Sequence, residues 1–159
     1  MNTNLKTTVA AALIFLLVGA VLFLVFEKQL NPNTSNKIGV GGDVTLRRDL
    51  SGHYRTEAFI NGVATNILVD TGATDVSISR QLAERLGITS VSAIRTQTAN
   101  GEAIGYMTRL DSIKIGGIEE RNVAAIIVDN LSSDALLGMS FLSRMDIRLH
   151  QNIMTIHSN

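Results

Sequence analysis

One aspartate in this chain stands where a carboxylate could do chemistry. Asp70 directly follows the apolar pair Leu68-Val69, and Thr71-Gly72 turns the chain immediately afterwards. Apolar runs of this kind are typical of buried strands, and a charge at the end of one is costly unless it is used or paired. A carboxylate held in place can act as a general acid or base. The stretch therefore predicts a reactive carboxylate, or, as the plainer alternative, an aspartate that only caps a turn.

The composition gives little support to other kinds of site. The chain has no Cys, which excludes disulfides and cysteine-based zinc sites. Its three histidines, His53, His150 and His157, are far apart and lack the spacing of metal ligands. The formal net charge is +0, so nothing indicates nucleic-acid binding. We therefore expect no metal, no organic cofactor and no nucleic-acid partner.

A β-hairpin is predicted to deliver Asp70. Every second residue from Tyr54 to Ile60 falls on one face, as in a strand with one buried side. Asn61-Gly62 is a strong two-residue hairpin signal, and residues 63–70 then return as the second arm. Asp70 is thus expected at the end of that second arm.

The rest of the chain reads as short strands separated by turns. Ser79 is a plausible N-cap for a helix over 79–87, which Gly87 can end. Asn100-Gly101 predicts a second hairpin, with arms over 94–99 and 103–108. The remaining expected elements are strands over 76–78, 109–115 and 123–128, helical turns over 139–145, and a closing hairpin with arms over 146–149 and 153–156. This pattern favours a small, mostly β barrel or sandwich.

The N-terminal segment is predicted to cross a membrane. Residues 9–26 contain no charged side chain, and as a helix they would span about 27 Å at about 1.5 Å per residue. A cleaved signal peptide is the alternative. The apolar run is longer than the usual h-region of about 7–15 residues, and no A-x-A-like site follows Phe26. We therefore favour an uncleaved anchor.

The expected organisation has four parts: a tail over 1–8, a transmembrane anchor over 9–26, a linker over 27–43 and one folded domain over 44–159. Lys6 precedes the anchor and Lys28 follows it, so the count of positive charges hardly decides orientation. The short tail favours an N-terminus inside the cytoplasm. We expect a single-pass protein of a bacterial inner membrane, with its domain on the periplasmic side.

Three features, in this order, carry a resemblance to a known family. They are the apolar-apolar-Asp-Thr-Gly-Ala stretch over 68–73, the Asn100-Gly101 hairpin and the apolar-apolar-Gly string Leu136-Leu137-Gly138. Residues 54–156 resemble a retropepsin-like (clan AA) aspartic protease. A single such domain behind an anchor, together with the string over 137–142, looks like a bacterial membrane-anchored branch of that clan. The resemblance implies a small closed acid-protease barrel with one or two short helices.

The resemblance also assigns roles around the aspartate. It implies that Asp70 is catalytic and that Thr71 and Gly72 build the active-site loop, with the Thr71 hydroxyl bracing the loop of a partner subunit. Ala73 would line the cleft beside the substrate backbone.

Two further segments receive roles from the resemblance. Asn100 and Gly101 would form a flap over the substrate, and Leu136, Leu137 and Gly138 a strand under the catalytic loop, with Leu136 beside a specificity pocket. One departure stands out. Retroviral relatives usually carry an Asp–Arg pair at the positions that Thr74 and Met139 occupy here, so one support of the dimer is missing.

Peptide hydrolysis by this route needs two carboxylates on one water, and this chain has a single Asp-Thr-Gly. The second carboxylate must then be Asp70 of another copy, which a two-fold homodimer provides. We expect a homodimeric endopeptidase that acts on polypeptides, with the termini contributing strands to the interface. The alternative of another class is a catalytically silent, membrane-anchored β-domain that binds a peptide or partner in the same cleft.

Overall fold

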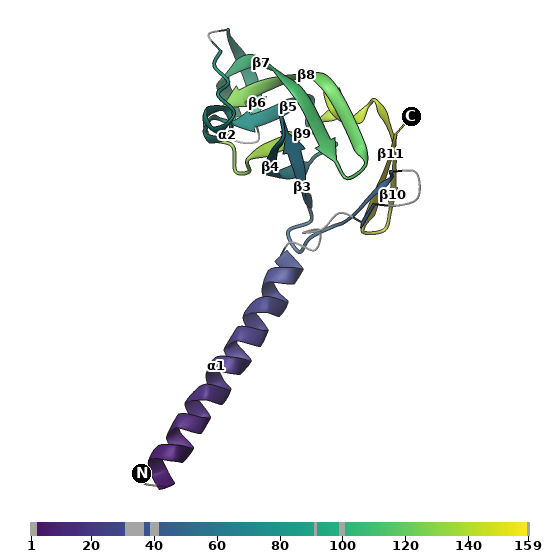
Figure 1. Ribbon diagram of the computed structural model, residues 1–159. Helices are drawn as coiled ribbons and strands as arrows, with labels where there is room; N and C mark the ends of the chain where they lie inside the picture. Colours follow the sequence, from purple (N-terminus) through teal and green to yellow (C-terminus); the bar gives the residue numbers. More distant parts are fainter. Residues whose placement is uncertain (1–2, 31–36, 39–41, 91, 99–100, 159) are drawn as a thin grey trace.

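The computed structural model describes residues 3–30, 37–38, 42–90, 92–98 and 101–158 (Figure 1). Asn100, predicted for the flap, therefore lies outside the described residues. The helices are α1 (Thr3–Leu30), α2 (Arg80–Arg85) and α3 (Met139–Leu142). The strands are β1 (Lys37–Ile38), β2 (Val44–Arg47), β3 (Tyr54–Ile60), β4 (Val63–Val69), β5 (Val76–Ser79), β6 (Ala93–Thr98), β7 (Gly101–Ile115), β8 (Ile118–Val128), β9 (Ala135–Leu137), β10 (Met145–His150) and β11 (Ile153–Ser158).

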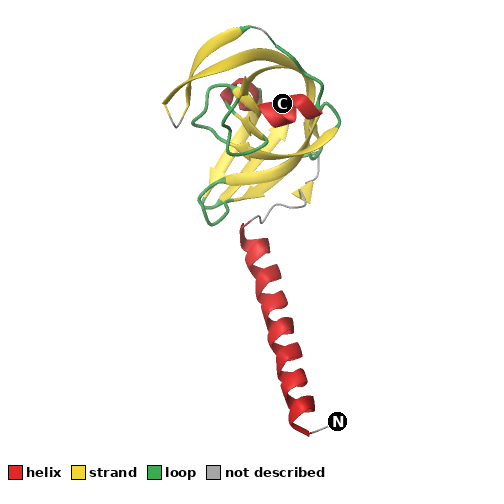
Figure 2. Cartoon of the chain, turned by 90° about the vertical axis from the view of Figure 1, so that its left-hand side faces the viewer, coloured by secondary structure: helices red, strands yellow, loops and turns green. Residues whose placement is uncertain are grey.

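The main body is a closed β-barrel, which confirms the predicted mostly β fold. Its strands run in the order β3-β4-β9-β5-β8-β7-β6, and β3 also pairs with β7. That extra pairing closes six strands, β3, β4, β9, β5, β8 and β7, into a ring. Strand β6 lies outside the ring. Figure 2 shows the barrel strands and the short helix α3 packed together, and the Phe141 side chain of α3 is fully buried.

Local sequence accounts for the first hairpin. Residues 54, 56, 58 and 60 are all buried, as the alternation predicted. Asn61 and Gly62 have positive φ angles of 48° and 80°, the conformation that a tight two-residue hairpin turn requires. Ser79 caps α2 as expected, because its side chain accepts a hydrogen bond from the Leu82 amide.

Strand β9 lies between two strands that are distant from it in sequence. It runs parallel to β4 on one side, with Leu137 opposite Val69, and antiparallel to β5 on the other, with Leu136 opposite Ser77. This three-residue strand pairs with the end of β4 and with the start of β5. It therefore supports residues 70–75, the segment that connects β4 to β5.

A second sheet has the order β1-β2-β11-β10. The C-terminal strand β11 pairs with β10 on one edge and with β2 on the other, both within its own chain. The sequence did not indicate β2. The segments predicted over 103–108 and 109–115 are one continuous strand, β7, because it pairs first with β6 and then along β8.

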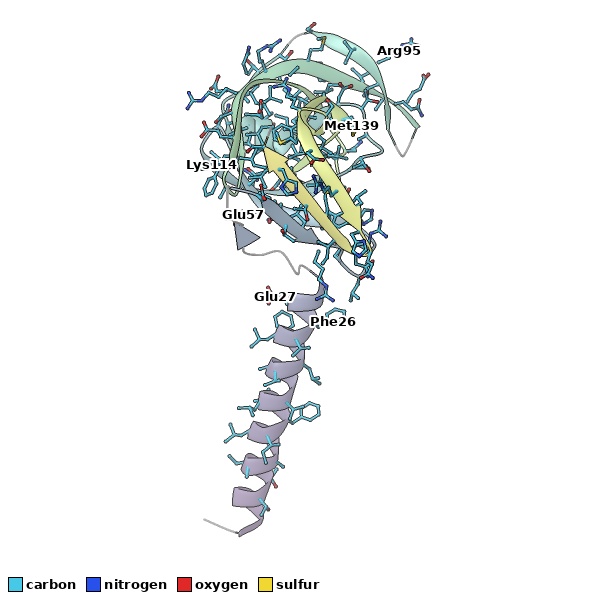
Figure 3. All side chains as sticks on the ribbon, turned by 90° about the vertical axis from the view of Figure 1, so that its right-hand side faces the viewer. Phe26, Glu27, Glu57, Arg95, Lys114 and Met139 are labelled. Carbon is cyan, nitrogen blue, oxygen red and sulfur yellow. The ribbon has the colours of Figure 1, made fainter. Side chains whose placement is uncertain are left out.

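Among the described residues, α1 is the one helix that is long and apolar enough to cross a membrane, over Thr7–Glu27. The side chains of residues 7–27 are exposed all round, and the helix extends away from the barrel in Figures 1 and 3. A signal sequence near the N-terminus would meet the same criteria. The structure thus provides either a membrane anchor or a signal sequence.

Candidate active site

Asp70 begins a tight loop at the end of β4. Its own carboxylate oxygen Oδ1 accepts a hydrogen bond of 2.8 Å from the Gly72 amide, and its carbonyl accepts one of 3.3 Å from the Ala73 amide. These bonds close the turn and fix the direction of the carboxylate. Asp70 and Ala73 are half-buried, whereas Thr71 and Gly72 are exposed.

Strand β9 and α3 hold this loop from beneath. The Asp70 amide donates to the Leu137 carbonyl at 3.0 Å, which continues the parallel pairing one residue beyond β4. The Met139 amide donates to the Ala73 carbonyl at 2.8 Å. The catalytic-loop and supporting-strand residues predicted from sequence therefore lie together and are joined by hydrogen bonds.

Ser140 of α3 also contacts the loop, and the sequence analysis gave it no role. Its amide donates to the Thr74 carbonyl at 2.8 Å, and its hydroxyl accepts from the Val76 amide at 3.1 Å. These two hydrogen bonds join the segments around Thr74 and Met139. Retroviral proteases of the resembled family usually carry an Asp–Arg pair at those two positions. No pattern within the chain could have indicated this contact, because it depends on how α3 follows β9.

Gly138 is needed for this close approach. A Cβ at position 138 would lie 2.4 Å from the Asp75 carbonyl oxygen and 2.8 Å from that of Ala73. Both neighbours are backbone atoms, so no side chain can move aside. Leu137 is fully buried below the loop, whereas Leu136 is half-buried.

The carboxylate is not enclosed by its own chain. Two surface cavities of about 210 and 340 Å³ flank the segment 131–134, and Asp70 lines neither. Within the described part of the chain, no group of three or more His, Cys, Asp or Glu side chains is placed to hold a metal ion. One chain therefore presents the half-buried Asp70 carboxylate on a loop that hydrogen bonds to β9 and α3 hold in place.

The predicted flap corresponds to the β6–β7 hairpin, in which Thr98 is opposite Gly101. Gly101 begins β7 in this hairpin, which extends beyond the barrel in Figure 2. Ile104 and Met107 on β7 are more than half exposed and give the hairpin an apolar surface. At its base, the guanidinium carbon of Arg80 lies 4.9 Å from the centre of the Tyr106 ring, and Arg80 also pairs with Asp129.

A buried carboxylate away from the site also escaped the sequence analysis. The Asp49 side chain is 2% exposed and accepts hydrogen bonds from the Ser51 hydroxyl at 2.7 Å, the His53 amide at 2.9 Å and Arg55 Nε at 3.1 Å. Burial alone would raise the pKa of Asp49, but these hydrogen bonds and the charge of Arg55 lower it overall. Asp49 thus holds the loop between β2 and β3.

Comparison with known proteins agrees with this geometry. Residues 56–144 match the family described as "gag-polyprotein putative aspartyl protease", a span that holds the Asp70 loop, the β6–β7 hairpin and β9. The chain belongs to the retropepsin-like aspartyl protease family. Its fold is similar to the crystal structure of a retropepsin-like aspartic protease from Rickettsia conorii, with a TM-score of 0.66 and 30% identity over 74% of this chain and 91% of that one.

Two curated relatives of this retropepsin-like chain are uncharacterised proteins. The protein in the cobV 5' region of Sinorhizobium sp. is 36% identical over 109 residues, which is 66% of this chain. Protein RP867 of Rickettsia prowazekii is 31% identical over 120 residues, which is 73% of this chain. The chain spans about half the length of the curated relatives it matches, 47% of one and 52% of the other.

Proposed function

We propose that this protein is a membrane-anchored aspartic endopeptidase that works as a homodimer. The observation that carries the proposal is the Asp70 carboxylate, oriented by the Gly72 amide on a loop that β9 holds in place. A side chain that only ended a strand would not need support from a segment so distant in sequence. Family membership supports the same reaction class.

In the proposed mechanism, the Asp70 carboxylates of two copies hold one water molecule between them. The ionised carboxylate takes a proton from the water as the water attacks the scissile carbonyl, and the protonated one donates a proton to the departing amide nitrogen. Two carboxylates about 3 Å apart share a proton, which supplies both roles at once. The exposed Thr71 would brace the partner's loop, and the β6–β7 hairpin would cover the peptide.

Loss of the carboxylate tests the proposal. The full chain in detergent should cleave an unfolded polypeptide at mildly acidic pH, and Asp70→Asn should lower the rate by at least about a hundredfold, in line with the loss of general acid–base catalysis. Asp75→Asn is the matched control, because Asp75 is an exposed carboxylate of the same segment and should leave the rate nearly unchanged. Full activity in Asp70→Asn would contradict the assignment, and peptide binding without cleavage by the wild type would favour the binding role.

For location, we propose that residues 9–26 stay as an anchor in a bacterial inner membrane and place the barrel in the periplasm. The exposed apolar surface of α1 supports this reading. Since the chain has no Cys, Ser51→Cys introduces a single thiol on the barrel. A membrane-impermeant thiol reagent should label it in spheroplasts, and labelling only after lysis would contradict the orientation.

A further inference from the structure

The outer edge of β10 is open in the described structure. β10 ends the second sheet, with β11 on its inner side and no described strand on its outer side. In an antiparallel sheet, every second residue of such an edge strand directs its N–H and C=O away from its neighbour. An edge of this kind is a template for another strand unless charged side chains, lysine especially, a proline or a bulge protect it.

The residues of β10 do not protect this edge. The strand has no proline and no lysine, and its acidic and basic side chains, Asp146 and Arg148, pair with each other at 2.9 Å. Leu149 is 55% exposed near the end of the strand, and Ile147 is half-buried. The edge thus offers backbone groups, apolar surface and two opposite charges.

Symmetry limits how two copies of β10 could pair. Two residues that lie opposite each other in an antiparallel pair have side chains on the same face of the sheet. The two-fold axis between two β10 strands must therefore pass midway between one residue and the same residue of the second copy. Only two registers keep all but one of the six residues paired, one centred on Ile147 and one on Arg148. The register centred on Arg148 sets that residue against its own copy, and like charges directly opposite are destabilising.

The register centred on Ile147 is self-complementary. It places Asp146 opposite the partner's Arg148, and Arg148 opposite the partner's Asp146. It also places Met145 opposite the partner's Leu149, which would cover the exposed apolar side chain. Opposite charges and apolar pairs directly across a strand pair both stabilise it.

We propose that β10 pairs antiparallel with β10 of a second copy, in the register centred on Ile147, and that this seam holds together the dimer of the proposed function. No strand is exchanged, because β11 is already paired on both edges within its own chain. The inference rests on the proposed function for its active-site role. It identifies what replaces the absent Asp–Arg pair.

The seam and the active-site loop are close in the structure. α3 directly precedes β10 and contacts it, and the amide of Met139 at the start of α3 donates to the Ala73 carbonyl of the loop. Figure 3 looks onto the β10–β11 hairpin, and Met139 lies at the upper end of these yellow strands. The proposal requires the two-fold axis of the β10 pairing to pass by the Asp70 loop as well.

Charge reversal tests the seam between chains. Asp146→Arg gives a chain with two positive side chains at the seam, and Arg148→Asp gives one with two negative side chains. Each variant alone should dimerise at least about tenfold more weakly than the wild type, because both cross-strand pairs become like-charged. A mixture of the two should recover dimer and peptide cleavage, because every pair in the mixed dimer is opposite in charge. Repulsion within each chain stays the same in the mixture, so recovery can only arise between chains.

Glu119 and Arg121 provide a matched control. They form the same kind of ion pair two residues apart, at 3.0 Å, on the exposed part of β8. Glu119→Arg and Arg121→Glu should leave dimerisation and cleavage unchanged, singly and mixed. Equal effects at both sites, or no recovery in the β10 mixture, would overturn the proposed seam.

Cross-linking tests the register. The chain has no Cys, so Ile147→Cys introduces one thiol, which would face its own copy with Cβ atoms about 5 Å apart, a separation that a disulfide can bridge after small adjustment. Oxidation of the full chain in detergent should give a disulfide-linked dimer. Arg148→Cys should cross-link much more slowly, and faster linking there would favour the rejected register.

The outcomes separate this inference from the proposed function. If the wild type cleaves peptide through Asp70 but neither recovery nor Ile147→Cys cross-linking occurs, the dimer forms through another surface and the seam is wrong. If the cross-link and the recovery of dimer occur but Asp70-dependent cleavage is absent, the seam stands and the protease assignment fails.

Discussion

A side chain larger than hydrogen has no room at position 138, and this exclusion shows how closely the Asp70 loop is supported. The loop carbonyls of Ala73 and Asp75 both lie within 3 Å of where a Cβ would be. The Ser140 hydroxyl then accepts a hydrogen bond from the Val76 amide at the end of the loop. The loop that carries the carboxylate is therefore held at Ala73, Asp75 and Val76, which gives the rigidity that the proposed acid–base catalysis requires.

Asp49 gives a prediction about stability and pH at the scale of one residue. Its pKa is lowered in the folded chain, so the unfolded chain binds a proton at higher pH than the folded one. The carboxylate thus stabilises the fold at neutral pH, and this contribution is lost as pH falls below about 4. Asp49→Asn should cost about 1–3 kcal/mol near pH 7, because asparagine keeps only one acceptor oxygen and lacks the charge that pairs with Arg55.

Chemical denaturation of both proteins between pH 7 and pH 3 measures this effect. The difference in free energy of unfolding should be constant near neutral pH and shrink below about pH 4. Asp111→Asn, at an exposed carboxylate, should change stability by less than about 0.5 kcal/mol. A difference that grows towards acid pH would contradict the role given to Asp49.

At the scale of elements, a side-chain contact attaches the β6–β7 hairpin to α2 and can be altered without changing the pairing of the two strands. Arg80 at the start of α2 stacks on Tyr106 of β7, with 4.9 Å between the guanidinium carbon and the ring centre. Tyr106→Leu removes the aromatic ring and should weaken this attachment by about 0.5–1 kcal/mol. Amide hydrogen exchange in β6 should then be about two to five times faster, as this loss of free energy implies, whereas Tyr106→Phe, which keeps the ring, should match the wild type. Equal exchange in both variants would show that the stacking does not restrain the hairpin.

Sequence patterns predicted the hairpins between neighbouring strands and missed the short strand β2, whose partner is distant in sequence. Alternation and Asn61-Gly62 were enough for the β3–β4 hairpin, because its strands pair across a two-residue turn. β2 is four residues long and pairs with β11 from the other end of the domain, so no local pattern marks it. The segments predicted over 103–108 and 109–115 are the single strand β7, because it pairs with β6 over its first part and with β8 from Gly105 onwards.

The same reasoning applies to the site. Asp70 and its turn were predicted from adjacent residues, and the supporting strand came from resemblance to a family. The bonds from Ser140 to the loop could not be predicted, since they depend on the placement of α3 beneath residues 74–76. The open edge of β10 also becomes visible only when β11 is known to occupy the inner side.

For the whole molecule, anchoring and dimerisation should act together. Chains tethered by α1 are concentrated in two dimensions, which favours a weak dimer without new contacts. In lipid vesicles, activity per chain should stay constant when the vesicles are diluted in buffer. It should fall when lipid is added at a fixed amount of protein, because the chains are then spread over more membrane.

Cleavage assays on reconstituted vesicles give both measurements. The same chain in detergent micelles is the control, and there dilution in buffer should lower activity per chain. Loss of activity on diluting the vesicles would contradict anchoring by residues 9–26 and would favour a cleaved signal sequence.

The position of β9 has a consequence for biosynthesis. The Asp70 loop obtains its hydrogen-bond partners from Leu137, Met139 and Ser140, which leave the ribosome long after the aspartate does. Until then, a nascent chain carries the carboxylate on a loop without its support. β10 is made later still, so a second chain cannot pair through it until residue 150 has left the ribosome. Under the proposed function, a cell that makes this protein would thus be shielded from premature proteolysis by the order in which the ribosome releases the chain.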